Sequence, residues 1–282
     1  MRWVIGKAAA AAALMSGLIM AVPAAAQDAG TPGARITLTR LDCGTFRQPR
    51  DVSGFSDSFA YASPPLKLPF VASCYLIRHE DRYMLWDAGF AAPTDQVALP
   101  KTVLQQLGEL GVDPASVAYV GVSHYHADHV GQAASFPKAT LLIGQGDWDA
   151  LTATPPRYTN SDPKFLAPWI SGGGKVEMVA RDKDVFGDGS VVILTLPGHT
   201  PGHRGLLVRL AGMGPVLISG DVVHFQENYD NRGVPSINTD RADSLASIDR
   251  FRDIADTLKA TVIIQHDPRS IAKLPSFPKA AE

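Results

Sequence analysis

Cysteine is scarce in this 282-residue chain, which contains only Cys43 and Cys74. Two thiols are too few for a four-cysteine metal site, so any metal centre must use other side chains. Both cysteines fall in or beside predicted strands. The sequence therefore leaves open whether they form a disulfide or remain buried free thiols.

A surplus of basic charge is also absent. The chain carries 26 Lys and Arg residues against 28 Asp and Glu residues, for a net charge of −2. A nucleic-acid-binding protein usually has a basic surplus, so no nucleic-acid partner is expected. Hydrophobic residues at 45% and charged residues at 19% indicate a globular protein rather than a disordered one. No linker or short-period repeat interrupts the chain, which predicts a single domain after the N-terminal segment.

The first 26 residues have the composition of a secretory signal peptide. Arg2 and Lys7 provide a positive start, residues 8–26 carry no charge, and three alanines precede Gln27 as a cleavage site. The alternative is an uncleaved membrane anchor, because 19 uncharged residues nearly span a bilayer. Alanine is only weakly apolar, which favours cleavage. We therefore expect a mature domain of residues 27–282, periplasmic or secreted, without stable membrane association.

Short apolar runs alternate with helical segments along the rest of the chain. Predicted strands cover residues 36–41, 73–78, 83–86, 118–122, 140–143, 191–196, 206–210, 216–219 and 261–265. Residues 102–110 and 241–258 have helical spacing, the second with a cap at Asp240 or Thr239. Strands interleaved with helices indicate an α/β layered domain. Two long segments rich in proline and aromatic residues, 50–70 and 154–174, are predicted to be loops.

Three histidines and an aspartate lie within six residues in the segment His124-Tyr125-His126-Ala127-Asp128-His129. The apolar residues before it indicate a strand that ends in a tight turn, with a helix starting near Asp128. Side chains two apart on an extended backbone point the same way, so His124 and His126 can bind one cation. Asp128 and His129 lie beyond the turn and can bind a second cation. Imidazole and carboxylate ligands suit zinc, iron, cobalt or manganese better than calcium or magnesium.

Three further candidate ligands each follow a predicted strand. His199 lies in the segment Pro197-Gly198-His199, Asp221 follows Ser219-Gly220, and His266 follows the strand at 261–265. Strand ends are where a layered α/β domain exposes side chains to a common crevice. Together with the segment 124–129, these residues predict a site for two divalent metal ions.

These segments resemble the metallo-β-lactamase superfamily of dinuclear hydrolases over residues 36–266. The matching segments are, in order, Trp86-Asp87-Ala88-Gly89, the run 124–129, the run 197–203, Ser219-Gly220-Asp221 and His266. The resemblance implies an α/β fold of the αβ/βα four-layer sandwich type, with two mixed sheets inside and helices outside.

The same resemblance implies a ligand set. His124, His126 and His199 would hold one metal, Asp128, His129 and His266 the other, and Asp221 would bridge them. Zinc is the expected metal, with iron, cobalt and manganese as alternatives. Asp87 would orient the ligand segment without binding metal. His203 would be structural.

The segment 225–235, and the position of His266 only 16 residues from the end, resemble the N-acyl homoserine lactonase branch of this superfamily. This implies a quorum-quenching enzyme that opens the lactone ring by attack of a metal-bridging hydroxide. Many members of the branch place a tyrosine three residues beyond the bridging aspartate, where it contacts the substrate carbonyl. His224 occupies that position here and can still donate a hydrogen bond or a proton. We expect His224 to act as an electrophilic donor and Asp128 to deliver a proton to the leaving group.

Aromatic residues are candidates for an apolar trough that holds the acyl part of a substrate. They are Phe55, Phe59, Tyr61 and Phe70 in the first long loop, with Phe225 after Asp221. Ordinary core packing explains the same residues equally well, so both interpretations stay open.

Other hydrolases on the same site are alternatives: an organophosphate triesterase, a β-lactamase or a glyoxalase-type thioesterase. A covalent serine mechanism is not indicated, because the chain has no Gly-x-Ser-x-Gly segment. A di-iron oxidoreductase is disfavoured, because such relatives usually place glutamate where His126 stands and the chain has no appended flavin-binding segment. A non-catalytic periplasmic metal-binding protein is the alternative from a different class. A homodimer is compatible with the sequence, which does not decide the oligomeric state.

Overall fold

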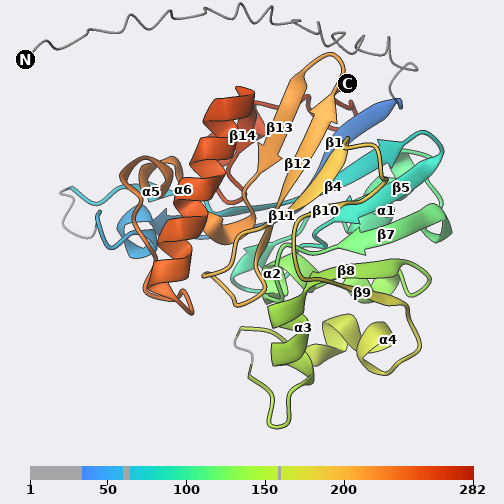
Figure 1. The fold of residues 1–282 in the computed structure, drawn as a ribbon, viewed down its shortest axis with the longest axis horizontal. Coiled ribbons are helices and arrows are strands. Elements are labelled where there is room, and N and C mark those ends of the chain that lie inside the picture. The colour runs from blue at the N-terminus through green and yellow to red at the C-terminus, as the bar shows by residue number, and fades with distance from the viewer. Residues whose placement is uncertain (1–33, 60–63, 158–159) are drawn as a thin grey trace, which may run out of the picture. The chain divides into compact units, whose positions relative to one another are not determined.

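Two β-sheets and the helices that cover them make up the computed structural model of this protein, which describes residues 34–59, 64–157 and 160–282. Residues 34–282 form one compact unit. The first sheet has seven strands in the order β6-β1-β4-β5-β7-β8-β9, and the second has five in the order β10-β11-β12-β13-β14 (Figure 1). The predicted signal peptide, residues 1–26, lies outside the described residues, as does Tyr61.

The strands of the first sheet are β1 (Ile36–Phe46), β4 (Val71–His79), β5 (Arg82–Trp86), β6 (Val97–Ala98), β7 (Val117–Gly121), β8 (Thr140–Gly144) and β9 (Val176–Val179). Those of the second are β10 (Lys183–Asp184), β11 (Val191–Thr195), β12 (Arg204–Leu210), β13 (Gly214–Ile218) and β14 (Thr261–Ile263). The short strands β2 (Arg50–Asp51) and β3 (Lys67–Leu68) pair with each other. The helices are α1 (Val103–Glu109), α2 (Ala127–Val130), α3 (Gln145–Thr152), α4 (Ala167–Ile170), α5 (Gln226–Asn231), α6 (Arg241–Leu258) and α7 (Pro268–Ile271).

Both sheets are mixed. In the first, β1, β4 and β5 are antiparallel, whereas β5, β7, β8 and β9 are parallel. In the second, the only parallel pair among the described strands is β13 with β14. Parallel partners end at the same edge: Trp86 pairs with Gly121, and Ile218 with Ile263. The segments that leave these four strands therefore start close together, and they carry most of the predicted ligands.

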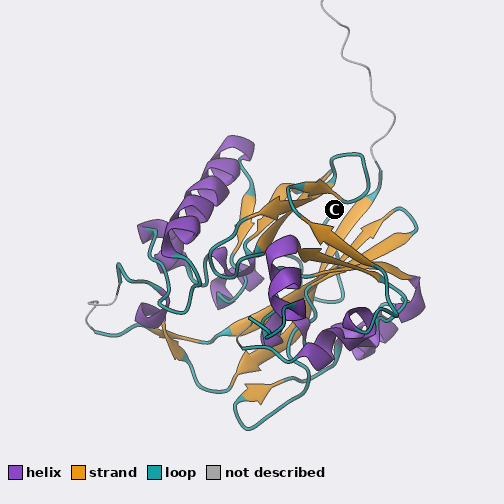
Figure 2. Cartoon of the chain, turned by 60° about the horizontal axis from the view of Figure 1, so that its bottom comes forward, coloured by secondary structure: helices purple, strands orange, loops and turns teal. Residues whose placement is uncertain are grey.

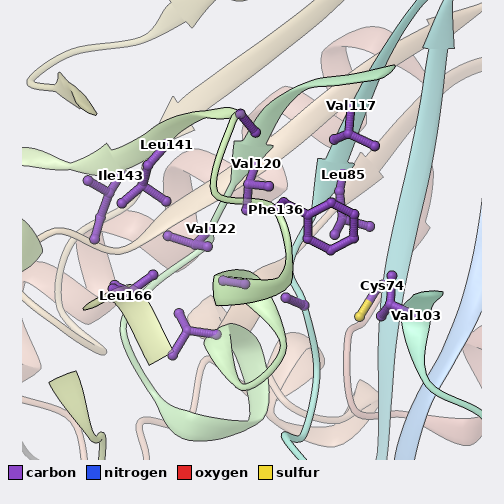
Figure 3. Close-up of a cluster of buried hydrophobic side chains, with 14 of the residues drawn as sticks. Cys74, Leu85, Val103, Val117, Val120, Val122, Phe136, Leu141, Ile143 and Leu166 are labelled. Atoms are coloured by element: carbon purple, nitrogen blue, oxygen red, sulfur yellow. The ribbon is translucent and has the colours of Figure 1, made fainter. Parts of the chain in front are cut away.

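Three apolar clusters define four layers. The inner cluster lies between the sheets and includes Ile77, Met84 and Trp86 of the first sheet and Leu206 and Ile218 of the second. A second cluster packs α1, α2, α3 and α4 on the outer face of the first sheet. Figure 3 shows part of this cluster, including Val103 of α1 and Leu85 and Val120 of the strands. A third packs α6 on the outer face of the second sheet. Figure 2 shows these helices on opposite outer sides of the strands. The expected αβ/βα four-layer sandwich is confirmed.

The long helix α6 has the predicted bounds. Its N-cap is Asp240, whose carboxylate accepts a hydrogen bond from the backbone N–H of Asp243, so Asp240 and not Thr239 is the capping residue. Ile248 and Phe251 are completely buried against the second sheet. The apolar spacing of an 18-residue helix is a strong local signal, which explains why the sequence predicts it well.

The prediction of a surface loop over residues 154–174 is wrong in its second half. This part contains α4, and Trp169 is buried there with its indole N–H donating to the carbonyl oxygen of Ala139, 3.0 Å away. A helix of four residues has no measurable periodicity, so sequence spacing does not reveal it.

Cys43 and Cys74 form a disulfide that joins β1 to its neighbour β4. The sequence left this pairing open. Among the described residues, no helix is both long and apolar enough to cross a membrane.

Candidate metal centre

The predicted ligands converge at one edge of the two sheets. His124, His126, His199 and Asp221 form one group, here called the first group. Asp128, His129 and His266 form another, here called the second group. Within each group the candidate ligand atoms all lie within 4.8 Å of one another. Residues more than 140 positions apart in the chain therefore lie close together.

Asp221 faces both groups. One carboxylate oxygen, Oδ2, lies 3.4 Å from His199 Nε2 and 3.8 Å from His124 Nε2. The other, Oδ1, lies 3.2 Å from His129 Nε2 and 2.8 Å from His266 Nε2. A carboxylate with one oxygen toward each group has the arrangement needed to bridge two cations.

The hydrogen bonds of the imidazoles show which nitrogens can serve as ligands. Nδ1 of His266 faces the carbonyl oxygen of Val71 at 2.7 Å, and Nδ1 of His129 faces the Asp87 carboxylate at 3.0 Å. These oxygens only accept, so both Nδ1 atoms carry the proton in the neutral ring. The lone pairs of the two Nε2 atoms then face each other across 3.3 Å. Two acceptors at this distance need a shared cation or proton between them.

The hydrogen bonds of the first group also show which imidazole nitrogens can serve as ligands. Nδ1 of His199 donates to Asn238 Oδ1 at 2.8 Å, which leaves the lone pair of Nε2 facing His126 Nδ1 at 3.0 Å. Nε2 of His124 is buried and has no hydrogen-bond partner among the described residues. Two ligands bound at about 2.0–2.1 Å in tetrahedral geometry are about 3.3–3.4 Å apart, close to the separations seen here. The residues present therefore fit a pair of divalent cations.

Electrostatics favour the neutral, ligating form of His126 and His199 in the first group and a positive charge at the second group. Burial lowers the pKa of His126 to about 4 and of His199 to about 3, against the opposing effect of Asp221. Both rings are therefore neutral at physiological pH, as metal ligation requires. Burial opposes a charge on His129, but the carboxylates of Asp221, Asp87 and Asp128 raise its pKa well above the usual value. Negative charge around the second group thus stabilises a positive charge placed there.

Asp87 lies behind the second group. It is completely buried at the end of β5; Oδ1 accepts the backbone N–H of Ser123 at 2.7 Å while Oδ2 contacts His129 Nδ1. His203 is also buried, and both of its ring nitrogens are engaged by backbone groups: Nδ1 donates to the carbonyl oxygen of Leu196, and Nε2 accepts the backbone N–H of Asp221 at 2.7 Å. This contact fixes the position of Asp221 through its own backbone. Gly220 makes this approach possible, because a Cβ there would lie 2.6 Å from His203 Nε2.

A cavity of about 710 Å³ opens onto the two groups. It is lined by Asp128, His126, His199, Asp221 and His224 from the site and by four phenylalanines, Phe46, Phe55, Phe70 and Phe90. Arg50, Asp51, Asn160 and Ile237 also line it. The cavity therefore combines a ligand-rich floor with an aromatic wall.

The predicted substrate-binding residues have different positions. Phe55 and Phe70 line the cavity, whereas Phe59 and Phe225 are not among its lining residues. Phe225 is completely buried in a small core with Val52 and Phe70, so core packing is the correct interpretation for this residue. The sequence analysis missed Phe46 and Phe90, because each belongs to a strand end or loop whose proximity to the site depends on sheet pairing.

His224 lines the cavity, but it points toward the Asp221 carboxylate. Its Nε2 is 3.1 Å from Asp221 Oδ2, and its ring lies 4.9 Å from the ring of Phe55. Its Nδ1 is buried without a hydrogen-bond partner among the described residues. Among the described residues, the close polar neighbour of the His224 ring is therefore Asp221, through Nε2.

Comparisons with known proteins agree with this geometry. The family model described as the Metallo-beta-lactamase superfamily matches residues 68–266. The N-acyl homoserine lactonase AttM of Rhizobium radiobacter is 32% identical over 195 residues, which cover 64% of this chain and 68% of the relative. AttM of Rhizobium johnstonii is 30% identical over 239 residues, covering 74% and 85%.

Solved structures show the same fold. The crystal structure of a quorum-quenching N-acyl homoserine lactone lactonase superposes with a TM-score of 0.73 at 22% identity, covering 88% of this chain and 98% of the other. An N-acyl homoserine lactone hydrolase with the product N-hexanoyl-L-homoserine at its catalytic metal centre superposes with a TM-score of 0.71 at 22% identity, covering 88% and 99%.

Proposed function

The chain belongs to the metallo-beta-lactamase superfamily, and we propose that within it this protein is a metal-dependent hydrolase that opens the lactone ring of N-acyl homoserine lactones. The observation that carries the proposal is the pair of imidazole and carboxylate groups joined by Asp221 at the floor of an aromatic cavity. The similarity to lactonases over most of the chain supports the choice of substrate.

The cations would be held by His124, His126, His199 and Asp221 on one side and by Asp128, His129, His266 and Asp221 on the other. When bound, two divalent ions lower the pKa of water to near neutrality and polarise the carbonyl to be attacked. Zinc suits these ligands, and iron, cobalt and manganese suit them as well. The protein fixes the lone-pair directions through Asn238, Val71 and Asp87, so little reorganisation accompanies binding.

Asp128 is the proposed proton carrier. It lines the cavity, and its Oδ2 lies 3.9 Å from Nε2 of both His129 and His266, so the carboxylate borders the reacting region. The attacking water loses a proton as its oxygen bonds to the lactone carbonyl carbon. Asp128 accepts this proton and returns it to the ring oxygen as the carbon–oxygen bond breaks. The product is an open-chain hydroxy acid, and no covalent enzyme intermediate is needed.

His224 has two possible partners in this reaction. Its Nε2–H can stay on Asp221 Oδ2 and orient the carboxylate, or it can turn to the developing oxyanion of the substrate, as the sequence suggested. Donation to the substrate requires the ring to give up its contact with Asp221. We therefore propose that His224 donates a hydrogen bond to the developing oxyanion, so that its loss lowers kcat.

The aromatic wall is the proposed site for the acyl part of the substrate. Phe46, Phe55, Phe70 and Phe90 present their rings around one cavity, and Ile237 is half-exposed at the same cavity. Burial of a chain against such a wall contributes about 0.8 kcal/mol for each methylene group. We expect substrates with longer acyl chains to have lower KM values.

We also propose that the protein acts in the periplasm or outside the cell. The basic and alanine-rich pattern of residues 1–26 supports export, and the disulfide between Cys43 and Cys74 supports an oxidising compartment.

The test combines metal analysis of the purified protein with turnover of a homoserine lactone, a phosphotriester and a cephalosporin. We expect about two divalent ions per chain and highest kcat/KM on the lactone. In Asp221→Ala, loss of the bridging carboxylate should release metal and lower lactone turnover by at least about 100-fold. Full activity of this variant would contradict the proposal. Preference for the phosphotriester or the cephalosporin would identify another hydrolase, and metal binding without any turnover would identify a non-catalytic metal-binding protein.

A further inference from the structure

Helix α3 packs directly against the segment that carries His199. The two backbones are in contact at glycines: a Cβ at Gly144 would lie 1.8 Å from the carbonyl oxygen of Gly202, and a Cβ at Gly202 would lie 2.3 Å from the backbone nitrogen of Asp147. No side chain fits at either position. The start of α3 is therefore held at a fixed distance from the ligand segment.

Asp147, in the first turn of α3, is completely buried at this contact. Thr200, the residue after His199, donates its hydroxyl to Asp147 Oδ2 at 2.9 Å. The backbone N–H of Gly202 donates to Oδ1 at 2.6 Å. Both donors belong to the segment that follows β11, so the carboxylate fixes the position of that segment.

The same carboxylate also reaches the other ligand segment. Burial raises the pKa of Asp147, and the donors that oppose this effect include, after Thr200 and Gly202, the backbone N–H of Tyr125, which lies between His124 and His126. Asp147 therefore lies behind both backbone segments that carry the three histidines of the first group. Arg204 supplies a compensating positive charge from the first residue of β12 and is itself buried.

Asp87 makes comparable contacts behind the second group. Asp87 joins the N–H of Ser123 to His129 of the second group. Asp147 joins the backbones of the first group without touching an imidazole. Each group of ligands thus has one buried carboxylate behind it, although only Asp87 lies in a segment that the sequence singled out.

We propose that Asp147 is a positioning residue of the first group: it holds the 124–126 turn and the His199 segment at the separation at which their imidazoles bind one cation. This inference rests on the proposed metal centre but not on the identity of the substrate. Removing the carboxylate should weaken metal binding at the first group and leave the second group intact. Partners behind metal ligands typically change affinity by about 10–100-fold.

The experiment compares Asp147→Asn with Asp149→Asn, which makes the same change at an exposed position of the same helix. The full-length protein is loaded with Co²⁺, and the affinity for each ion is measured from visible absorption during competition with a chelator. Proton NMR of the loaded protein follows the paramagnetically shifted ring N–H signal of His199, which Asn238 holds, and those of His129 and His266. Thermal unfolding shows that each variant is folded.

For Asp147→Asn we expect one of the two ions to bind about 10–100-fold more weakly and the His199 signal to shift or disappear, with the His129 and His266 signals retained. Asp149→Asn should behave as the unsubstituted protein. Two ions bound with unchanged affinity and unchanged signals in folded Asp147→Asn would overturn the inference and leave the proposed function standing. Absence of bound ions from the unsubstituted protein would overturn both.

A milder pair of variants covers the case in which Asp147→Asn does not fold. Thr200→Val removes one donor to Asp147 and leaves the carboxylate in place, whereas Thr200→Ser retains the hydroxyl. We expect Thr200→Val to weaken binding of one ion by several-fold and Thr200→Ser to restore it. Equal affinities in the two variants would contradict the positioning role.

Discussion

Asp87, which lies behind the second group, adopts a backbone conformation that is uncommon for residues other than glycine. Its φ is 57°, in the left-handed region, which costs energy for most residues and least for glycine, asparagine and aspartate. In this conformation the carboxylate reaches the N–H of Ser123 and the imidazole of His129 at once. The backbone N–H of Ala88 also donates to the carbonyl oxygen of His129 at 2.6 Å. The local strain is therefore part of how the second group is held.

Asp87→Asn should remove the carboxylate charge and keep the backbone conformation, because asparagine tolerates the same φ. We expect a folded protein in which the second group binds its ion about 10–100-fold more weakly, since the amide no longer stabilises the Nδ1–H tautomer of His129. Metal content after dialysis against a chelator is the measurement. Asp87→Ala, which also disfavours the backbone conformation, should in addition unfold at lower temperature than Asp87→Asn. Unchanged metal retention in Asp87→Asn would show that the carboxylate charge is dispensable.

Replacing His224 by phenylalanine tests the contribution of its ring nitrogens to the reaction. His224→Phe removes the donor to Asp221 Oδ2 and keeps an aromatic ring beside Phe55. If His224 stabilises the developing oxyanion, kcat on the lactone should fall by about 10²-fold or more while KM and metal content change little. His224→Tyr, which restores a hydroxyl donor, should recover part of the loss. Equal kcat values for the unsubstituted protein and His224→Phe would remove His224 from the mechanism.

At the scale of elements, a contact between β4 and the turn that joins β10 to β11 ties the two sheets together. His79 ends β4 in the first sheet, and its Nε2 lies 2.7 Å from Asp188 Oδ2 in the turn between β10 and β11 of the second. Partial burial opposes the charge on Asp188, but hydrogen bonds from Ser190 and His79 lower the pKa of Asp188 to about 2. The folded protein thus favours the ionised carboxylate.

This shift predicts a defined pH dependence. A carboxylate whose pKa is lower in the folded state adds stability above its unfolded pKa of about 3.9, and that stability is lost as pH falls through the folded value. Asp188→Asn should therefore be less stable than the unsubstituted protein at pH 5–6, with the difference disappearing between about pH 4 and pH 2. Urea unfolding across this range measures it. Because the pair is partly exposed, we expect a small effect, and a difference that persists at pH 2 would contradict this assignment.

The elements also differ in how far the sequence predicts them. The strands β5, β7, β8 and β11 and the helix α6 were predicted to within about one residue at each end, because apolar spacing over five or more residues is a local property. The short helices α3, α4, α5 and α7 were not predicted. Their positions depend on contacts such as the burial of Trp169 and the glycine contacts at the start of α3, which join residues distant in sequence.

For the whole molecule, the disulfide is the one covalent tie between distant parts of the described chain. It closes a loop of 31 residues between β1 and β4, and both sulfurs are buried in the outer core of the first sheet. A disulfide reduces the conformational entropy of the unfolded chain. For a loop of this length, the chain-entropy treatment gives a stabilisation of the folded state of about 3–4 kcal/mol. The backbone of Cys43 also accepts the N–H of Phe90, in a loop that lines the cavity.

The double variant Cys43→Ala with Cys74→Ala should lose about 3–4 kcal/mol of unfolding free energy, and somewhat more if the removed sulfurs leave a cavity. Denaturant unfolding with and without reductant measures the loss. The reductant should destabilise the unsubstituted protein by a similar amount and leave the double variant unchanged. If the reductant has no effect on the unsubstituted protein, the disulfide does not contribute to its stability.

The sequence by itself determined the residue types of the candidate ligands, their positions after strands and the α/β layered architecture. These follow from local spacing and from the coordination preferences of side chains, which need no knowledge of distant contacts, whereas the four-layer sandwich and a supporting position for Asp87 were implied by the family resemblance. Only the tertiary structure decided which nitrogen of each imidazole faces the site, that His224 turns to Asp221, that Phe225 belongs to the core, that the two cysteines pair, and that Asp147 lies behind the first group. Each of these depends on strand register and helix packing between residues far apart in the chain, and a linear pattern carries no record of such distances.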